Sequence, residues 1–148
     1  MEKRCATLDD LEKETTRFVE SLVLGAEKAT LVTLSGELGA GKTAFVKGIA
    51  KALGVTNRVT SPTFVLEKKY RLPSISGENK FKNLVHIDAY RLENGSALST
   101  LGFDELMSNP KNLILLEWPE QVSDALPKPS VHIEIKILPD ESRNILYA

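Results

Sequence analysis

The sequence predicts an α/β fold, a three-layer sandwich built on a mostly parallel sheet with antiparallel strands toward the C-terminus. Three observations lead to this prediction. Apolar, β-branched residues at 29–34 precede a glycine-rich loop, and apolar residues at helical spacing follow that loop. Candidate strands and helices then alternate along the chain, as in sheets with parallel strands. Residues 131–138 alternate apolar and polar side chains, a pattern typical of a half-exposed strand.

Size and composition indicate one globular domain. The chain has 148 residues, of which 42% are hydrophobic and 26% charged, and these are ordinary values for a soluble protein. We therefore expect residues 1–148 to form a single domain. The formal net charge of −1 provides no general attraction to nucleic acid or to an anionic membrane. Cys5 cannot form an internal disulfide, and no secretory or membrane-spanning segment is evident, so we expect a cytoplasmic protein.

The first helix is predicted to follow Thr7, whose spacing to Asp10 fits a capping box. One face of this helix carries Leu11, Thr15, Phe18 and Leu22. Gly25 is predicted to end it. The helix after the glycine-rich loop is predicted to end at Gly54. Its apolar face carries Phe45, Val46, Ile49, Ala50 and Leu53.

Later strands are predicted at residues 64–70, 84–88, 112–117, 131–138 and 145–147. The last two are expected to pair with each other across a turn. A helix is predicted over residues 96–107, with a break near Gly102. Residues 73–80 are rich in turn formers and indicate a surface insertion. The basic run at 68–71 has two interpretations, a solvated strand end or a contact with RNA or an acidic partner.

Residues 36–43 read G-x-x-x-x-G-K-T, the phosphate-binding loop known as the P-loop. Its glycines let the backbone turn tightly and point N–H groups at phosphate oxygens. Lys42 can reach the β- and γ-phosphates, and the Thr43 hydroxyl can ligate Mg²⁺. The positive end of the following helix strengthens the anion site. Because a buried strand precedes the loop and a helix follows it, we predict a P-loop NTPase-like fold that binds nucleotide phosphates.

Carboxylates follow two of the predicted buried strands. Asp88 ends the strand Leu-Val-His-Ile-Asp, and Glu117 ends the strand Leu-Ile-Leu-Leu-Glu. Hydrolysis of a nucleotide with Mg²⁺ needs acids at the carboxyl ends of strands beside the loop. Both residues can take that role, and the alternative for each is a turn cap after a strand. Glu117 is the stronger metal candidate, because its strand is the more continuously apolar.

Three further features have two interpretations each. Residues 60–64, Thr-Ser-Pro-Thr-Phe, fit a switch loop that senses the γ-phosphate or a simple turn. His86 lies in an apolar strand and fits a core or supporting histidine better than a catalytic base. Trp118 follows Glu117 and either packs at the sheet edge or has a functional role, as a cover for the nucleotide site or a partner contact.

Five sequence blocks occur in an order that is more specific than the P-loop alone. They are residues 36–43, 61–64, 86–92, 101–105 and 117–120. Together they resemble the TsaE family, small bacterial ATPases of tRNA threonylcarbamoyladenosine synthesis. The resemblance extends from Leu11 to Ile135, which is nearly the whole chain.

The resemblance implies a site for ATP or ADP with Mg²⁺. The phosphate-binding residues would be Glu37, Leu38, Gly39, Ala40, Gly41, Lys42 and Thr43. Thr43 and Glu117 would ligate Mg²⁺. Lys42, Asp88 and Glu117 would be the catalytic residues, with Asp88 supporting hydrolysis near the metal.

The resemblance also implies neighbours of the nucleoside and partner proteins. Thr63, in the switch-like loop, and Trp118 would lie beside the nucleotide, and the first helix would lie near adenine through Glu12 or Thr15. The partners would be the tRNA threonylcarbamoyl transferase and its catalytically inactive paralogous companion. ATP hydrolysis would reset that assembly rather than form the modified base. Contact with tRNA would be shared or indirect, and no membrane would be involved.

Two other P-loop functions compete with this one. A small-molecule or nucleoside kinase would carry an arginine-rich lid, whereas the arginines of this chain are scattered. A regulatory GTPase would read guanine with an Asn-Lys-x-Asp element, and the pair Asn79 and Lys80 lacks the Asp. We therefore predict a Mg²⁺-dependent ATPase that prefers adenine. Because no arginine finger is evident, hydrolysis by the isolated chain should be slow and stimulated by partners.

Overall fold

The computed structural model describes residues 1–37, 39–55, 67–73 and 81–148, and the strands within these ranges form one seven-stranded sheet. In chain order the strands are β1 (Glu2–Cys5), β2 (Thr30–Ser35), β3 (Glu67–Arg71), β4 (Asn83–Asp88), β5 (Asn112–Glu117), β6 (Val131–Ile137) and β7 (Arg143–Tyr147). Their order across the sheet is β1-β7-β6-β2-β5-β4-β3. The strand that leads into the P-loop, β2, therefore lies in the middle, between β6 and β5.

The pairing confirms a mostly parallel sheet with antiparallel edges. The strands β6, β2, β5 and β4 run parallel to one another. β7 is antiparallel to β6, as the turn between them predicts, and β1 and β3 add antiparallel edges. Sequence patterning does not predict β1, because its residues lack an apolar alternation and Cys5 alone of them is buried.

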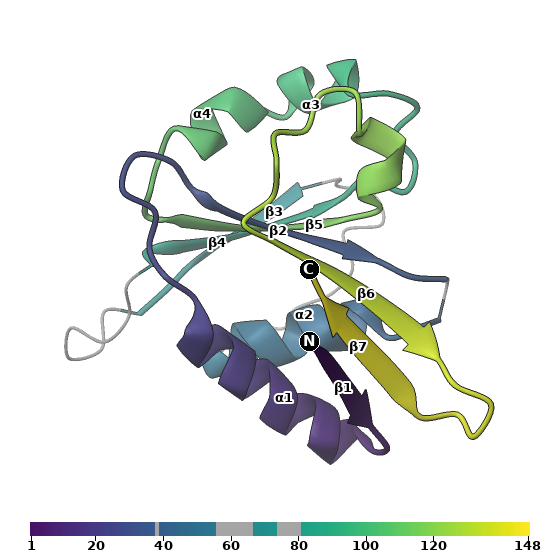
Figure 1. Ribbon diagram of the computed structural model, residues 1–148. Helices are drawn as coiled ribbons and strands as arrows, with labels where there is room; N and C mark the ends of the chain where they lie inside the picture. The colour runs from purple at the N-terminus through teal and green to yellow at the C-terminus, as the bar shows by residue number, and fades with distance from the viewer. Residues whose placement is uncertain (38, 56–66, 74–80) are drawn as a thin grey trace.

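Helices cover both faces of the sheet and complete the three layers (Figure 1). They are α1 (Leu8–Ser21), α2 (Lys42–Ala52), α3 (Ser96–Thr100), α4 (Phe103–Met107) and the 3₁₀ helix η1 (Pro119–Val122). α1 and α2 pack on one face, and the other three lie on the opposite face. Successive residues of β5 serve the two cores, because Leu115 packs with α1 and α2 whereas Leu116 packs with α3 and α4. No helix in the described ranges is long and apolar enough to cross a membrane.

α1 begins at the predicted capping box but ends earlier than predicted. The Thr7 side chain accepts a hydrogen bond from the Asp10 N–H at 3.1 Å, and the Asp10 carboxylate accepts one from the Thr7 N–H at 3.2 Å. The helix stops at Ser21 rather than near Gly25. It stops there because Leu22 adopts an extended conformation and buries its side chain in the core.

The predicted helix at residues 96–107 is interrupted at Gly102, as expected. α3 ends at Thr100 and α4 begins at Phe103. Gly102 has a φ of 71°, a left-handed conformation that glycine adopts without strain. The break lets both short helices place an apolar residue, Leu98 and Phe103, in the same core.

A buried carboxylate on α1 is hydrogen-bonded to the last strand. Glu14 is 6% exposed, and its carboxylate accepts hydrogen bonds from Arg17 Nε at 3.0 Å and from the Tyr147 hydroxyl at 2.7 Å. Burial raises the pKa of Glu14, but these hydrogen bonds outweigh burial and hold the pKa below its usual value. Phe18 stacks on Tyr147 with ring centroids 5.4 Å apart. These contacts hold α1 against the antiparallel end of the sheet.

α1 also packs directly on α2, the helix that follows the P-loop. Thr15 is fully buried, and a Cβ at Gly48 would lie 2.4 Å from Thr15 Oγ1, so a glycine at this position permits the close approach. Glu12 forms an ion pair with Lys51 of α2 at 2.6 Å. Glu12 and Thr15, which the resemblance places near adenine, thus both take part in the packing of these two helices.

Candidate functional site

The P-loop connects the end of β2 to the start of α2, at the carboxyl edge of the parallel strands. Gly41 is the N-cap of α2, with a φ of 110°, and no side chain caps the helix there. Gly39 also has a positive φ, 80°. The first N–H groups of α2 therefore remain available to an anion, as binding at a helix start requires. Leu38 lies outside the described residues.

The beginning of the loop lies directly against β6. A Cβ at Gly36 would be 2.6 Å from the carbonyl oxygen of Ile135, a distance that no side chain tolerates without movement of the backbone. Glycine at this position therefore sets how closely the loop follows the sheet as it leaves β2. Ala40 is buried in the core that α1 and α2 cover, which anchors the other end of the loop.

Lys42, the first residue of α2, is held by the loop itself. It is 5% exposed, and its Nζ donates to the carbonyl oxygen of Gly36 and, at 3.0 Å, to that of Glu37. The ammonium group also lies 4.3 Å from the ring centroid of Trp118, a cation–π contact. The structure thus places the positive charge inside the curve of the P-loop.

Two predicted acids meet beside Lys42. Asp88 and Glu117 are directly opposite each other in the parallel pairing of β4 with β5. Glu117 is 2% exposed, whereas Asp88 is half-buried and its Oδ1 accepts the Tyr90 N–H at 3.0 Å. Burial lowers the pKa of Lys42, and the negative charges of Glu117, Glu120 and Asp88 oppose that shift. The structure therefore brings one ammonium group and two carboxylates to the same edge of the sheet.

Glu117 also contacts a buried histidine. His86 is 0% exposed, and its Nε2 lies 2.5 Å from Glu117 Oε2. Its other ring nitrogen, Nδ1, has no hydrogen-bond partner within the described ranges. This placement agrees with a core or supporting histidine and leaves no exposed ring nitrogen to act as a base.

Trp118 turns the chain away from β5 in a left-handed conformation, with φ 62° and ψ 53°. The backbone N–H of Trp118 donates to the Leu34 carbonyl oxygen at 3.1 Å, which ties the end of β5 to the end of β2. The indole ring lies 4.9 Å from the ring of Tyr90, centroid to centroid, and Tyr90 is 43% exposed. Trp118 therefore packs at the sheet edge and covers Lys42 at the same time.

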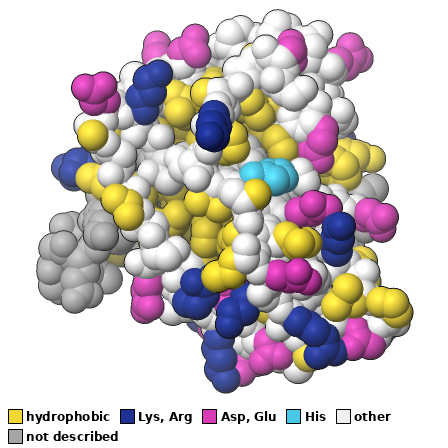
Figure 2. All heavy atoms as spheres, viewed as in Figure 1, with side chains coloured by type: hydrophobic (Ala, Val, Ile, Leu, Met, Phe, Trp, Pro, Cys, Tyr) yellow, Lys and Arg dark blue, Asp and Glu magenta, His cyan; other side chains and the backbone are white. Residues whose placement is uncertain are grey.

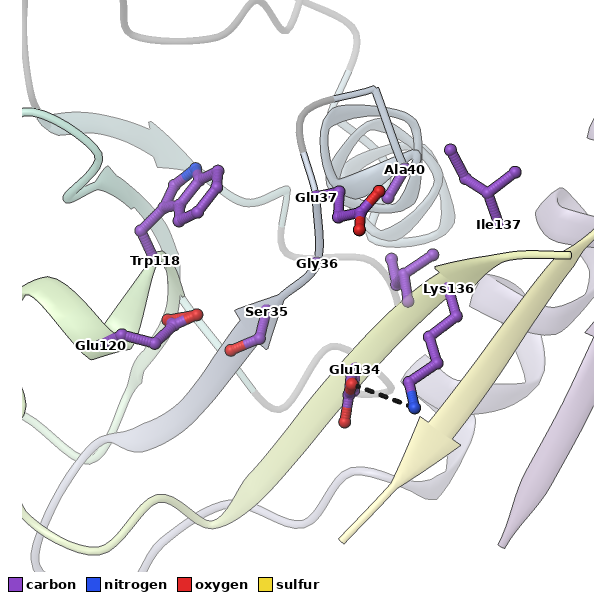
Figure 3. Close-up of a pocket in the computed structure, with 10 residues that line it drawn as sticks. Ser35, Gly36, Glu37, Ala40, Trp118, Glu120, Glu134, Lys136 and Ile137 are labelled. Carbon is purple, nitrogen blue, oxygen red and sulfur yellow. Dashed lines mark ion pairs between the residues drawn. The ribbon is translucent and has the colours of Figure 1, made fainter.

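A cleft of about 460 Å³ opens beside the P-loop (Figure 3). Trp118 and Glu120 border one side, Lys136 and Ile137 border the opposite side, and the start of the loop lies between them. Lys136 forms an ion pair with Glu134 at 3.5 Å along the wall formed by β6. The volume falls in the range of about 300–1,000 Å³ that is usual for small-molecule sites.

Arg143 lies beside the P-loop, a placement that the sequence does not reveal. It is the first residue of β7, and its Nη2 donates to the Gly39 carbonyl oxygen at 3.5 Å, although 104 positions separate the two. A Cβ at Gly41 would lie 3.7 Å from Arg143 Nε. β7 and the strand that carries Glu117 lie on opposite sides of β2. The guanidinium therefore approaches the P-loop from the side away from the carboxylates.

The two residues expected to bind Mg²⁺, Thr43 and Glu117, do not form a complete metal site by themselves. Thr43 is half-buried in the first turn of α2. Within the part of the chain that the structure describes, no three His, Cys, Asp or Glu side chains are grouped to hold a metal ion. Mg²⁺ in nucleotide sites ordinarily takes one or two carboxylates together with phosphate oxygens and waters, so such a group is not required. Thr63 and the rest of the expected switch segment, residues 60–64, lie outside the described ranges, as do residues 74–80.

Comparisons with known proteins agree with one another. Residues 10–145 match the family described as threonylcarbamoyl adenosine biosynthesis protein TsaE. The tRNA threonylcarbamoyladenosine biosynthesis protein TsaE of Rickettsia typhi is 35% identical over 133 residues, which are 89% of this chain and 86% of that protein. The protein of the same name from Bacillus subtilis is 36% identical over 138 residues, which are 91% of this chain and 79% of that protein. The crystal structure of Bacillus subtilis YdiB aligns with a TM-score of 0.76 at 28% identity, covering 99% of this chain and 83% of that one.

Proposed function

This chain belongs to the TsaE family, and we propose that it is an ATP-binding, ATP-hydrolysing subunit required for threonylcarbamoyladenosine modification of tRNA. Its relatives are named for the biosynthesis of tRNA threonylcarbamoyladenosine. The observation that carries the ATPase proposal is the meeting of Lys42 with Asp88 and Glu117 at the P-loop. An ammonium group for the phosphates and carboxylates for the metal are the parts that nucleotide hydrolysis needs at this edge.

Phosphate binding would use the N–H groups at the start of α2 together with Lys42. The ammonium group of Lys42 now donates to the carbonyl oxygens of Gly36 and Glu37. Phosphate oxygens carry negative charge, so they are stronger acceptors for an ammonium group than neutral carbonyls. Nucleotide binding would thus exchange the carbonyl partners of Lys42 for phosphate oxygens a short distance away.

The Thr43 hydroxyl and the Glu117 carboxylate would hold Mg²⁺, because hydroxyl and carboxylate oxygens suit this hard cation. His86 bonds one Glu117 oxygen, Oε2, which leaves Oε1 for the metal. When bound, Mg²⁺ supplies charge neutralisation at the phosphate being transferred. Asp88, directly opposite Glu117, would orient the attacking water.

The nucleoside would extend toward β6 and β7. With the carboxylates on the β5 side of the loop, the terminal phosphate belongs there, and the rest of the nucleotide points to the other side. That side holds Arg143 at Gly39 and the cleft walled by β6. We assign Arg143 to the nucleoside half of the ligand, where its charge would meet the inner phosphates or its plane would stack on the base.

The proposed partners are the tRNA threonylcarbamoyl transferase and its inactive paralogous companion, whose assembly ATP hydrolysis would reset. Acidic and basic side chains are interspersed over the face viewed in Figure 2, and the formal net charge is −1. A protein with this charge distribution is suited to contacts through its protein partners more than to strong direct binding of tRNA. Because Arg143 approaches from the side away from Asp88 and Glu117, it is not placed to act as an arginine finger, and a partner would supply one.

The decisive experiment is ATP turnover by the purified chain alone, with the two partners, and with the partners and tRNA. We expect slow hydrolysis alone, faster turnover in the assembly, and tighter binding of ATP than of GTP. Brisk activity that partners leave unchanged would reject the partner-coupled role, and tighter GTP binding would reject the ATPase assignment. Transfer of labelled phosphate to a nucleoside rather than to water would favour the kinase alternative.

A further inference from the structure

We propose that His86 is a positioning residue for Glu117: its Nε2–H fixes one carboxylate oxygen so that the other faces the P-loop and can bind Mg²⁺. This inference rests on the proposed Mg²⁺-dependent nucleotide site. It adds a residue whose task is to orient a ligand of the metal without touching metal or nucleotide. Partners of this kind are common behind metal-binding carboxylates and histidines.

The contact is short and enclosed. His86 Nε2 and Glu117 Oε2 are 2.5 Å apart, and the side chains are 0% and 3% exposed. A buried carboxylate must be hydrogen-bonded, because its transfer from water is otherwise costly. A carboxylate that binds Mg²⁺ is ionised and only accepts, so in this role the proton of the bond belongs to His86 Nε2. Rotation of the Glu117 carboxylate is therefore restricted by a donor from the neighbouring strand.

The position of His86 in the sheet explains the direction of this bond. In the pairing of β4 with β5, His86 is opposite Leu115, two residues before the pair formed by Asp88 and Glu117. Leu115 belongs to the core beneath α1 and α2, and residues directly opposite each other share a face of the sheet. His86 thus reaches Glu117 from the core side, which leaves the outer side of the carboxylate toward the P-loop.

The rest of the histidine ring supports a role directed at Glu117. Its Nδ1 is buried without a hydrogen-bond partner among the described residues, and an unsatisfied buried polar group lowers stability. On its own face of the sheet His86 lies next to Leu84 of β4 and Leu115 of β5, which are fully buried apolar residues. Packing alone would favour another apolar side chain here, so the bond to Glu117 is what offsets the cost of an imidazole. Asp88 needs no such partner, because the Tyr90 N–H already holds its Oδ1 at 3.0 Å.

The test is the Mg²⁺ concentration at which a fluorescent ADP analogue reaches half of its metal-dependent gain in affinity. His86→Leu should raise this midpoint about 10- to 100-fold, the usual cost of losing a partner behind a metal ligand. Binding of the analogue in EDTA should be unchanged. His86→Gln, whose amide N–H can reach the same oxygen, should restore most of the Mg²⁺ response. His132→Leu is the matched control. His132 lies on β6 and bonds Thr33 Oγ1 at 2.8 Å, so this variant should keep the wild-type midpoint.

Each outcome is decisive. A wild-type midpoint in His86→Leu, or an equal shift in His132→Leu, overturns the positioning role. If His86→Leu fails to fold, the comparison of His86→Gln with His86→Asn replaces it, since the shorter amide of asparagine should not reach Glu117; equal midpoints for these two overturn the proposal. If the wild-type chain binds the analogue equally with and without Mg²⁺, the proposed nucleotide site itself fails. A wild-type Mg²⁺ response that all His86 variants retain removes the positioning role alone.

Discussion

Replacement of Lys42 by methionine isolates the charge of the P-loop ammonium group. Lys42 is 5% exposed, and methionine is a flexible side chain of similar length that fills buried positions well. In the wild type, Nζ must leave the carbonyl oxygens of Gly36 and Glu37 before it binds phosphate. The effect of Lys42→Met on nucleotide affinity is therefore the free energy of the contact with phosphate minus that of the contacts with the two carbonyl oxygens.

The size of that difference follows from the contacts. A hydrogen bond to a charged group contributes about 1.5–3 kcal/mol, and about 1.4 kcal/mol changes a dissociation constant tenfold. Loss of the phosphate contact therefore predicts a rise in Kd for ADP or ATP of about 10- to 150-fold. Movement of Nζ to the phosphates would also weaken its cation–π contact with Trp118, which contributes about 0.5–2 kcal/mol, so we expect a value near the lower end.

Isothermal titration of ADP with Mg²⁺ measures the change, and thermal unfolding confirms that the variant is folded. Lys47→Met is the matched control, because Lys47 lies on the exposed side of the same helix and should leave Kd unchanged. A folded Lys42→Met protein with the wild-type Kd would refute the placement of Lys42 at the phosphates.

The pH dependence of binding offers a second measurement on the same residue. Burial lowers the pKa of Lys42 below its usual 10.5, although nearby carboxylates oppose the shift. Between the folded pKa and 10.5 the unfolded chain binds more protons, so the contribution of Lys42 to stability rises with pH in that window. Affinity for phosphate should fall over the same window, because the ammonium loses its charge, and Lys42→Met should abolish this fall.

Four other changes give direct tests of the site and the fold. Glu117→Ala should abolish the Mg²⁺ dependence of ADP binding and retain much of the metal-free affinity; titrations with Mg²⁺ and with EDTA measure both, and an unchanged Mg²⁺ response contradicts the metal role. Arg143→Gln should weaken ADP and ATP by the same factor in such titrations, and a loss confined to ATP would instead place this residue at the γ-phosphate. Gly36→Ala should lower the free energy of unfolding by about 1–3 kcal/mol in urea, because its Cβ would lie 2.6 Å from a carbonyl oxygen of β6; a wild-type midpoint would show that the loop can move aside. Tyr147→Phe removes the 2.7 Å hydrogen bond to Glu14 and should cost about 1.5–3 kcal/mol near neutral pH. Since the pKa of Glu14 is held below 4.5, the stability difference between wild type and variant should shrink as the pH falls through the folded pKa. A pH-independent difference would contradict a hydrogen bond from Tyr147 to an ionised Glu14.

Local patterns were enough to predict the framework of this protein. The apolar run of β2, the glycines of the P-loop and the helical spacing after it lie within about 25 consecutive residues, so burial and backbone conformation can be read without knowledge of the fold. The runs that end at Asp88 and Glu117 are equally local, and parallel strands place their carboxyl ends at one edge. The capping box at Thr7 and the break at Gly102 also depend only on neighbouring residues.

Contacts between distant segments were decided by the tertiary structure. Arg143 meets Gly39 across 104 positions, and that contact depends on β7 folding back beside β6. The bond from His86 to Glu117 depends on β4 lying next to β5 in one particular register. The edge strand β1 exists only because β7 offers it a partner, since its own residues carry no strand pattern. Periodicity reports which side of an element is buried, whereas strand order and register determine which buried groups touch, and those come from the packing of the whole chain.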